Sequence, residues 1–228
     1  MIAALLGFTL FLAVVVPPLE PTTALPDAGE SVSVKRDREL TPEDLETLTA
    51  ASIEFQSGRY QSALAILEKA ATKSPPHPET LNLRGAALVE LGRQKEAGQI
   101  FRWVLEIEPT HFWAQFNLAE IALLDRDILA ARRLFLSVPR GTSAEDELVN
   151  LKILLIDLRS NDLPSARNHL PKWPPVSAAG YAAYAAMANA EGDSSKRIEL
   201  IEQARSLHPE QFGAFLQKTL EESGIPLN

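Results

Sequence analysis

The chain has 228 residues, of which 46% are hydrophobic and 23% are charged, a composition typical of a folded protein rather than a disordered one. Its net charge of -8 argues against nucleic acid as a partner, because DNA and RNA are bound largely through Lys and Arg. The absence of cysteine excludes disulfides, thiolate metal sites and cysteine nucleophiles.

The first predicted element is an apolar segment at the N-terminus. No charged residue occurs from Met1 to Leu19, and residues 2–16 are almost purely apolar. This length lies between a typical signal-peptide core and the about 20 residues that cross a bilayer comfortably, so residues 1–24 are predicted to be a signal peptide or a membrane anchor. A buried N-terminal helix is the alternative. Either export interpretation predicts a periplasmic or other extracytoplasmic location, with a membrane contact through this segment if it is not cleaved.

A linker and then a helix start follow the apolar segment. Residues 25–40 are charged, contain proline and are predicted to form a flexible linker. Thr41 followed by Pro42 is a typical helix beginning, because threonine caps the first turn and proline fits its geometry. We therefore expect the folded domain to begin at residue 41.

An internal repeat with a period of 34 residues is the most informative feature of the sequence. Gly58 recurs as Gly92, and four further matches occur at the same spacing: residues 60–63 with 94–97, Leu67 with Phe101, Ala70 with Val104, and Pro75 with Pro109. Ala119, Ala131 and Phe135 continue the register into a third unit. Apolar residues at helical spacing on both sides of each glycine predict two amphipathic helices per unit.

The repeat continues less regularly toward the C-terminus. The second helix of the third unit is predicted to stop at Pro139, and that of a fourth unit to be truncated by the proline-rich residues 171–175. A fifth unit has its turn at Gly192. Residues 211–223 are predicted to form a terminal helix that covers the exposed apolar end. The repeat domain is thus expected to cover residues 41–224.

The second unit resembles the tetratricopeptide repeat (TPR) family. The family pattern of large, small and aromatic positions, then alanine, an aromatic and proline, is matched by Leu81, Arg84-Gly85, Leu88, Ala97, Phe101 and Pro109. Leu81 and Leu88 stand where the family has Trp and Tyr. The resemblance implies an all-α fold, a right-handed α-solenoid of about five helix-turn-helix repeats with a C-terminal capping helix. It also implies a concave groove, lined by the first helix of each unit, that binds a peptide or helix of another protein.

The candidate groove residues share one face of each first helix, because they recur at helical spacing. They are Phe55, Glu79, Asn82, Ala86, Glu90, Trp113, Phe116, Glu120 and Leu124. Trp113 and Phe116 are the predicted anchors, although aromatics at this spacing also suit a core. Some members of the family bind C-terminal carboxylates through paired Lys and Asn. Here only Asn82 matches and the three glutamates would repel a carboxylate, so an apolar or basic segment is expected.

Catalytic and metal-binding signatures are missing from the sequence. No phosphate-binding loop, Gly-x-Ser-x-Gly or His-Glu-x-x-His motif is present. His77, His111 and His208 occupy inter-repeat turns, where capping or exposure is expected rather than metal binding. We therefore predict no enzyme activity, no catalytic residue, no metal, no cofactor and no small-molecule substrate. An enzyme site in the fourth unit, near Asp157 and His169, is a remote alternative.

Two non-enzymatic functions remain. The first is a protein-protein interaction scaffold or adaptor at the cell envelope, and the second is a structural or self-assembling subunit of an envelope complex. The apolar leader and the repeat favour the first. The family resemblance does not separate them, because a fold does not determine a function.

Overall fold

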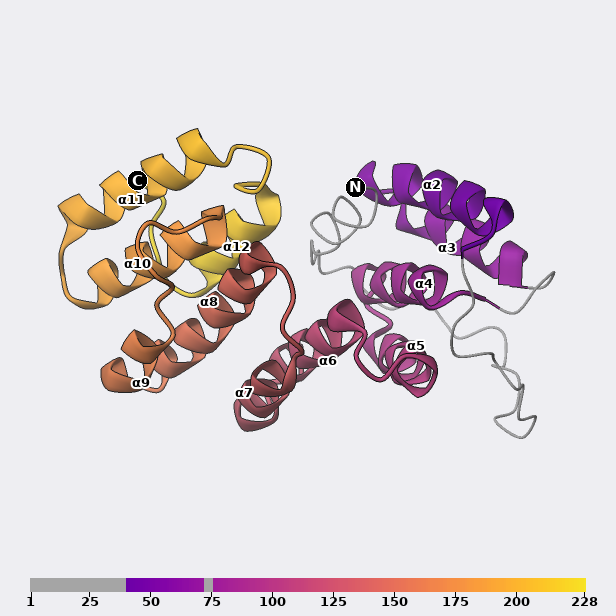
Figure 1. Cartoon of the computed structure of the whole chain (residues 1–228), viewed down its shortest axis with the longest axis horizontal. Coiled ribbons are helices and arrows are strands. Elements are labelled where there is room, and N and C mark those ends of the chain that lie inside the picture. The colour runs from indigo at the N-terminus through magenta and orange to yellow at the C-terminus, as the bar shows by residue number, and fades with distance from the viewer. Residues whose placement is uncertain (1–39, 72–75) are drawn as a thin grey trace. The chain divides into compact units, whose positions relative to one another are not determined.

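The computed structural model describes residues 40–71 and 76–228 of the chain (Figure 1). Within these ranges every regular element is a helix, as the repeat predicts. The predicted leader, residues 1–24, lies outside the described residues, and so does the linker up to residue 39. None of the helices in the described ranges is long and apolar enough to span a bilayer.

The helices follow one another in five pairs and one final helix. They are α2 (Pro42–Gln56) and α3 (Tyr60–Ala71), α4 (Pro78–Glu90) and α5 (Gln94–Ile107), α6 (Phe112–Leu124) and α7 (Ile128–Ser137), α8 (Ser143–Arg159) and α9 (Leu163–Asn168), α10 (Ala178–Ala190) and α11 (Ser194–Leu207), and α12 (Ala214–Glu222). The predicted all-α solenoid of five helix pairs with a terminal helix is confirmed. The described part of the chain divides into two compact units, the first ending at Asn117 and the second beginning at Leu118.

A residue with positive φ separates the two helices of every pair. These residues are Gly58 (φ 71°), Gly92 (75°), Arg126 (61°), Asn161 (57°) and Gly192 (80°). A left-handed residue after the last helical turn ends a helix and reverses the chain, and glycine adopts this conformation without steric cost. The predicted turns at the three glycines are confirmed, and Arg126 and Asn161 take the same conformation in the third and fourth units.

Helix starts follow the chemistry expected from the sequence. Thr41 and Asp44 form a reciprocal capping box at α2, in which each side chain accepts a hydrogen bond from the other residue's backbone N–H. Thr142 and Glu145 form the same arrangement at α8. The Glu145 carboxylate is therefore part of a helix start.

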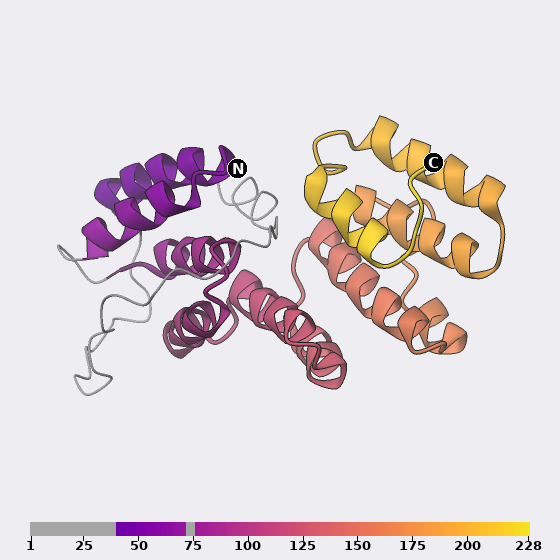
Figure 2. The ribbon, with the colours of Figure 1, turned by 180° about the vertical axis from the view of Figure 1, so that it is seen from behind.

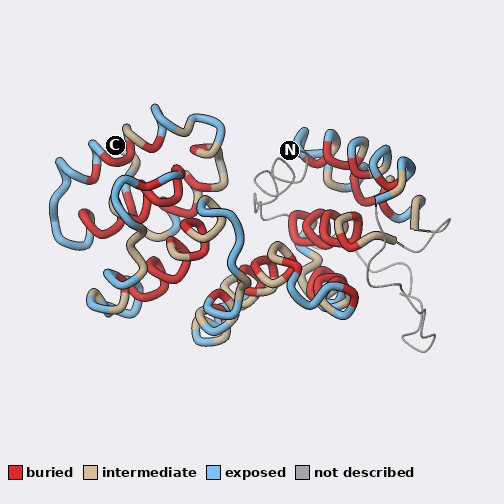
Figure 3. The backbone as a smooth tube through the Cα atoms, viewed as in Figure 1, coloured by how far each residue is buried: buried red, intermediate tan, exposed pale blue. Residues whose placement is uncertain are grey.

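The first helices of the pairs are more deeply buried than the second helices (Figure 3). Along α4 and α10 almost every residue is buried, since small side chains let the neighbouring helices approach. Gly85 on α4 shows how close: a Cβ added there would lie 2.5 Å from the Phe101 ring of α5. Glycine at this position lets α4 and α5 pack in contact.

The terminal helix α12 lies beside α10 within the second unit (Figure 2). It is shorter than the predicted helix over residues 211–223, and begins at residue 214. Its buried Leu216 and Leu220 supply apolar contacts. The side chains of Phe215 and Thr219 reach Lys152 of α8, two helix pairs back along the chain.

Candidate functional site

The structure places the nine predicted groove residues at different depths. Glu79 and Trp113 are partly exposed, and Leu124 is exposed. The other six are buried: Phe55, Asn82, Ala86, Glu90, Phe116 and Glu120. Glu79, Trp113 and Leu124 are therefore exposed enough to contact a partner directly. The other six residues are packing residues.

Asn82 of α4 and Asn117 of α6 join two successive first helices in the first compact unit. The Nδ2 group of Asn117 donates a hydrogen bond of 3.2 Å to Oδ1 of Asn82, and both side chains are buried. Oδ1 of Asn117 is also buried and has no hydrogen-bond partner among the described residues. Ser52 Oγ on α2 is a second atom of this kind. Such atoms are costly, because a buried polar group without a partner loses its hydration.

His111 links the start of α6 to Glu79 of α4. Its Nδ1 accepts the backbone N–H of Ala114, so the proton of the neutral ring is on Nε2, which lies 3.7 Å from a Glu79 carboxylate oxygen. Burial lowers the pKa of His111 to about 4 and raises the pKa of Glu79. His77 Nδ1 likewise accepts the N–H of Glu79 at the start of α4. The expected helix-capping role of the histidines is confirmed for His77 and His111.

Three aromatic side chains cluster on the first turns of α6. The ring of Trp113 makes edge contacts with Phe112 and Phe116, at centroid distances of 4.9 and 5.7 Å. Phe116 is fully buried, whereas Trp113 keeps part of its surface exposed. Phe116 thus holds the cluster in the core, and Trp113 is the aromatic residue available at the surface.

Glu120 is paired with a lysine. It lies on the part of α6 that belongs to the second compact unit. Its carboxylate lies 3.1 Å from Nζ of Lys152 on α8, and this ammonium also donates to Thr219 Oγ1 at 3.3 Å. The ring of Phe215 lies 4.6 Å from the same ammonium. From the sequence, Glu120 was predicted to repel a carboxylate in the groove, and its pairing with Lys152 was not predicted. A cation inside the apolar run of α8 was the available signal, because such a residue needs an anion when buried.

The residues of the alternative enzyme site have structural contacts. Asp157 accepts hydrogen bonds of 2.6 and 3.2 Å from the Arg132 guanidinium, and His169 Nε2 lies 3.7 Å away. Burial lowers the pKa of His169. Asp162 caps α9 by accepting the N–H of Ser165, and Asn161 is the turn residue. Within residues 40–71 and 76–228, no three His, Asp or Glu side chains gather as they would around a metal ion.

Comparisons with known proteins point to one fold. No protein-family model and no curated protein sequence matches the chain. Among solved structures, a thermophilic TPR protein of Thermus thermophilus is similar with a TM-score of 0.62 and 16% identity, over 80% of this chain and 100% of that one. MamA, residues 41 to the end, from Desulfovibrio magneticus is similar with a TM-score of 0.54 and 20% identity, over 77% and 100%. The fold is that of TPR proteins.

A third structure supports the same fold. A tetratricopeptide repeat protein from Parabacteroides merdae has a TM-score of 0.53 and 14% identity over 81% of this chain and 77% of its own. Two of the polar contacts described above join the first helices of successive pairs: the Asn82–Asn117 hydrogen bond joins α4 to α6, and the Glu120–Lys152 pair joins α6 to α8.

Proposed function

We propose that this TPR chain is a protein-binding scaffold of the cell envelope, without enzyme activity, which binds a segment of a partner protein on the first helices of residues 40–117. The observation that carries the proposal is a pair of partly exposed side chains on successive first helices, Trp113 on α6 and Glu79 on α4. The Asn82–Asn117 hydrogen bond joins the same two helices. Because both of its side chains are buried, it holds the helices together and is not itself a partner contact.

Trp113 and Glu79 are the proposed surface contacts. Trp113 is held by the Phe112 and Phe116 rings, so little side-chain entropy is lost when it binds a partner. Glu79 is partly exposed on the neighbouring helix, and its carboxylate favours a segment that carries apolar and basic side chains. The TPR-like neighbours add general support, because helical repeats of this kind suit the binding of extended or helical peptides.

Site-specific crosslinking in cells tests the partner-binding proposal. A photoreactive amino acid at position 113 should capture a discrete protein, whereas the same group at position 207 should not. Leu207 is a suitable control because it is 58% exposed on α11, in the other compact unit. Equal capture at both positions, or none at position 113, would refute the proposed surface.

The envelope location is proposed from the apolar N-terminal segment alone. Residues 2–16 have the composition of an export signal or anchor. Mass determination of the mature protein distinguishes cleavage, which removes about 24 residues, from anchoring, which retains them. A full-length protein found only in the soluble cytoplasmic fraction would contradict the proposed location.

A further inference from the structure

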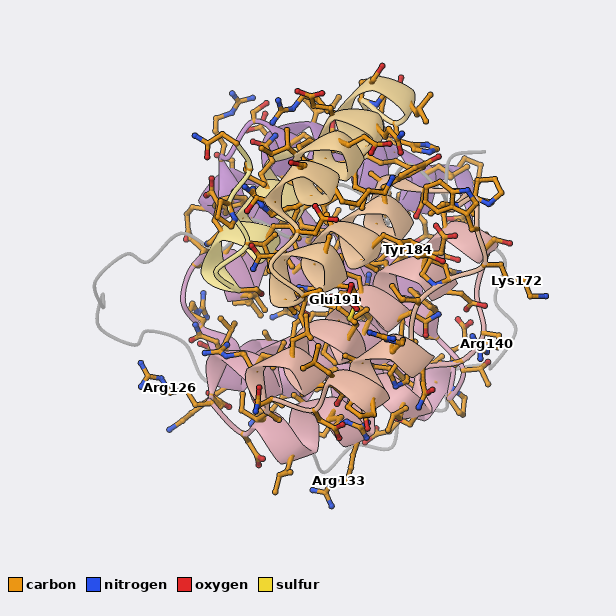
Figure 4. All side chains as sticks on the ribbon, turned by 90° about the vertical axis from the view of Figure 1, so that its left-hand side faces the viewer. Arg126, Arg133, Arg140, Lys172, Tyr184 and Glu191 are labelled. Carbon is orange, nitrogen blue, oxygen red and sulfur yellow. The ribbon has the colours of Figure 1, made fainter. Side chains whose placement is uncertain are left out.

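A pocket of about 600 Å³ lies beside α10, α11 and the loop that follows the short helix α9. Its volume is within the range of about 300–1,000 Å³ that is usual for small-molecule sites. Met187 of α10 and Leu200 of α11 line it and are 3% and 1% exposed. Figure 4 shows Tyr184 and Glu191, two further lining residues, along this side of the unit. The pocket therefore has an apolar floor that belongs to the packed core, with room for a small ligand above it.

One wall of the pocket is an exposed tryptophan that its neighbours hold in place. Trp173 is 55% exposed, yet its ring makes edge contacts with Tyr184 at 5.2 Å and with Tyr181 at 5.9 Å. The Tyr184 hydroxyl donates a 2.7 Å hydrogen bond to the carbonyl of Pro171, which ties the loop that carries Trp173 to α10. Because the ring is already fixed, it loses little conformational entropy when a flat apolar surface stacks on it.

The rim of the pocket carries charged side chains whose charges sum to zero. Two are cationic and two are anionic: Arg167, Lys196, Glu191 and Asp193. Arg167 donates a hydrogen bond to Glu191, and Asp193 accepts the backbone N–H of Lys196 at the start of α11. The Lys196 ammonium donates to Glu199 at 2.9 Å. Because cations and anions balance, the rim has no electrostatic preference for an ionic ligand of either sign.

An aromatic wall and a rim of balanced charges favour an uncharged ligand that has both hydroxyl groups and a flat apolar face. A hydroxyl group donates and accepts hydrogen bonds, so it can pair with guanidinium and ammonium groups and equally with carboxylates. A purely apolar ligand would take the charged rim out of water without replacing its hydrogen bonds, which is costly. A sugar ring with equatorial hydroxyl groups has hydroxyls around its edge and C–H groups on its faces, and therefore matches both the rim and the tryptophan.

We propose that this pocket binds a neutral sugar ring of a glycan. Trp173 is the platform on which the face of the ring stacks, and the four charged side chains of the rim form hydrogen bonds with its hydroxyl groups. All residues of the pocket belong to the second compact unit. The proposal therefore goes beyond partner binding at Trp113 and Glu79 in the first unit and does not depend on it.

Isothermal titration calorimetry of the full chain tests the proposal with two neutral trimers of equatorially substituted rings, cellotriose and chitotriose. The chain is kept in a detergent without a sugar headgroup, so that the detergent does not compete for the pocket. At least one trimer should bind with a dissociation constant on the order of 0.1–1 mM, because one stacked ring and a few hydroxyl groups provide a small interaction free energy.

Two tryptophan variants show whether the binding depends on this pocket. Trp173→Ala should raise the Kd for the trimer at least about tenfold, whereas Trp173→Phe should retain part of the affinity because a smaller ring still stacks. Trp113→Ala is the matched control, since it also removes a partly exposed tryptophan but lies in the first compact unit. It should bind the trimer like the wild type. Thermal unfolding checks that each variant is folded.

The charge of the probe separates a neutral-sugar site from an ionic one. The affinity for the neutral trimer should change less than about twofold between about 50 and 500 mM salt. Chitosan trimer, which has the rings of chitotriose with positively charged amino groups at acidic pH, should bind no tighter than chitotriose. Tighter binding of chitosan trimer, no saturable binding of either neutral trimer up to about 10 mM, or equal binding by wild type and Trp173→Ala would overturn the proposal. Octaproline that binds more tightly than the sugars, and only when Trp173 is present, would also overturn it by assigning the pocket to a peptide.

Discussion

The ammonium of Lys152 lies 3.1 Å from the carboxylate of Glu120, and both side chains are buried. Thr219 and the Phe215 ring of α12 complete the surroundings of this ammonium. The pair therefore connects α6, α8 and the terminal helix within the second unit. A buried ion pair of this kind need not add net stability, but neither partner can be removed alone without leaving the other charge desolvated.

Replacing Lys152 by methionine is expected to lower the free energy of unfolding by about 3–5 kcal/mol, because Glu120 would be left as an unpaired buried charge. Urea denaturation measures the change. The double variant K152M/E120Q should recover much of the loss. As a control, Lys196→Met removes a pair with Glu199 that is exposed, and should cost about 1 kcal/mol or less. Equal losses in the two single variants would contradict the buried-pair interpretation.

Replacing Gly192 by alanine is expected to destabilise the chain by about 1–2 kcal/mol. No atom lies within 4 Å of an added Cβ at this position, so the cost comes from the φ of +80° alone. Gly213→Ala is the matched control, because that site is equally open and its φ is -84°. Thermal unfolding should separate the two variants, and a Gly192→Ala chain as stable as Gly213→Ala would show that the turn tolerates a side chain.

The chain should lose stability as the pH falls from about 6.5 toward 4. The pKa of His111 is lowered to about 4 in the folded chain from 6.5, so in this window the unfolded state binds a proton that the folded state does not. The loss attributable to His111 is on the order of 2–3 kcal/mol. It should be absent in His111→Asn, which keeps a capping acceptor but does not titrate.

The shifted pKa values of His169 and Glu79 also affect stability in this pH range, so the wild type must be compared with a His111 variant. Burial also lowers the pKa of His169, which adds a loss of the same sign, while the raised pKa of Glu79 stabilises the folded state at low pH. The difference between wild type and His111→Asn isolates the contribution of His111. Parallel stability curves for the two proteins would exclude it.

Phe116→Ala is expected to destabilise the first unit by about 3–5 kcal/mol, since the side chain is fully buried. Trp113→Ala removes a partly exposed ring and should cost less stability while weakening partner capture more. Leu207→Ala should change neither property appreciably. Unfolding and capture are measured on the same preparations. Loss of capture that follows stability alone would assign Trp113 to the core.

Much of the fold could be predicted from the repeat. Gly58, Gly92 and Gly192 marked three of the five turns because glycine adopts a positive φ without a steric cost. Arg126 lies 34 residues after Gly92 and takes the same conformation, so this turn keeps the spacing of the repeat, although it was not predicted because the residue is not glycine. The proline-rich segment after α9 likewise indicated a short helix, although not the pocket that results.

The candidate site was predictable only in part. Helical spacing placed Glu79, Asn82 and Glu90 on one face of α4, but spacing carries no information on how deeply that face is covered. The Asn82–Asn117 hydrogen bond joins residues one position out of register with the 34-residue repeat, so no pattern match could pair them.

The sequence by itself determined the helix pairs, their turns, their caps and the class of fold, because periodicity, glycine and capping residues act over a few neighbouring positions. Only the tertiary structure decided which side chains are buried and which charges meet. The contact of Lys152 with Thr219 spans 67 residues and depends on the path of α12 back to α8. Contacts of that kind depend on how whole helices pack, and local spacing in a sequence does not encode them.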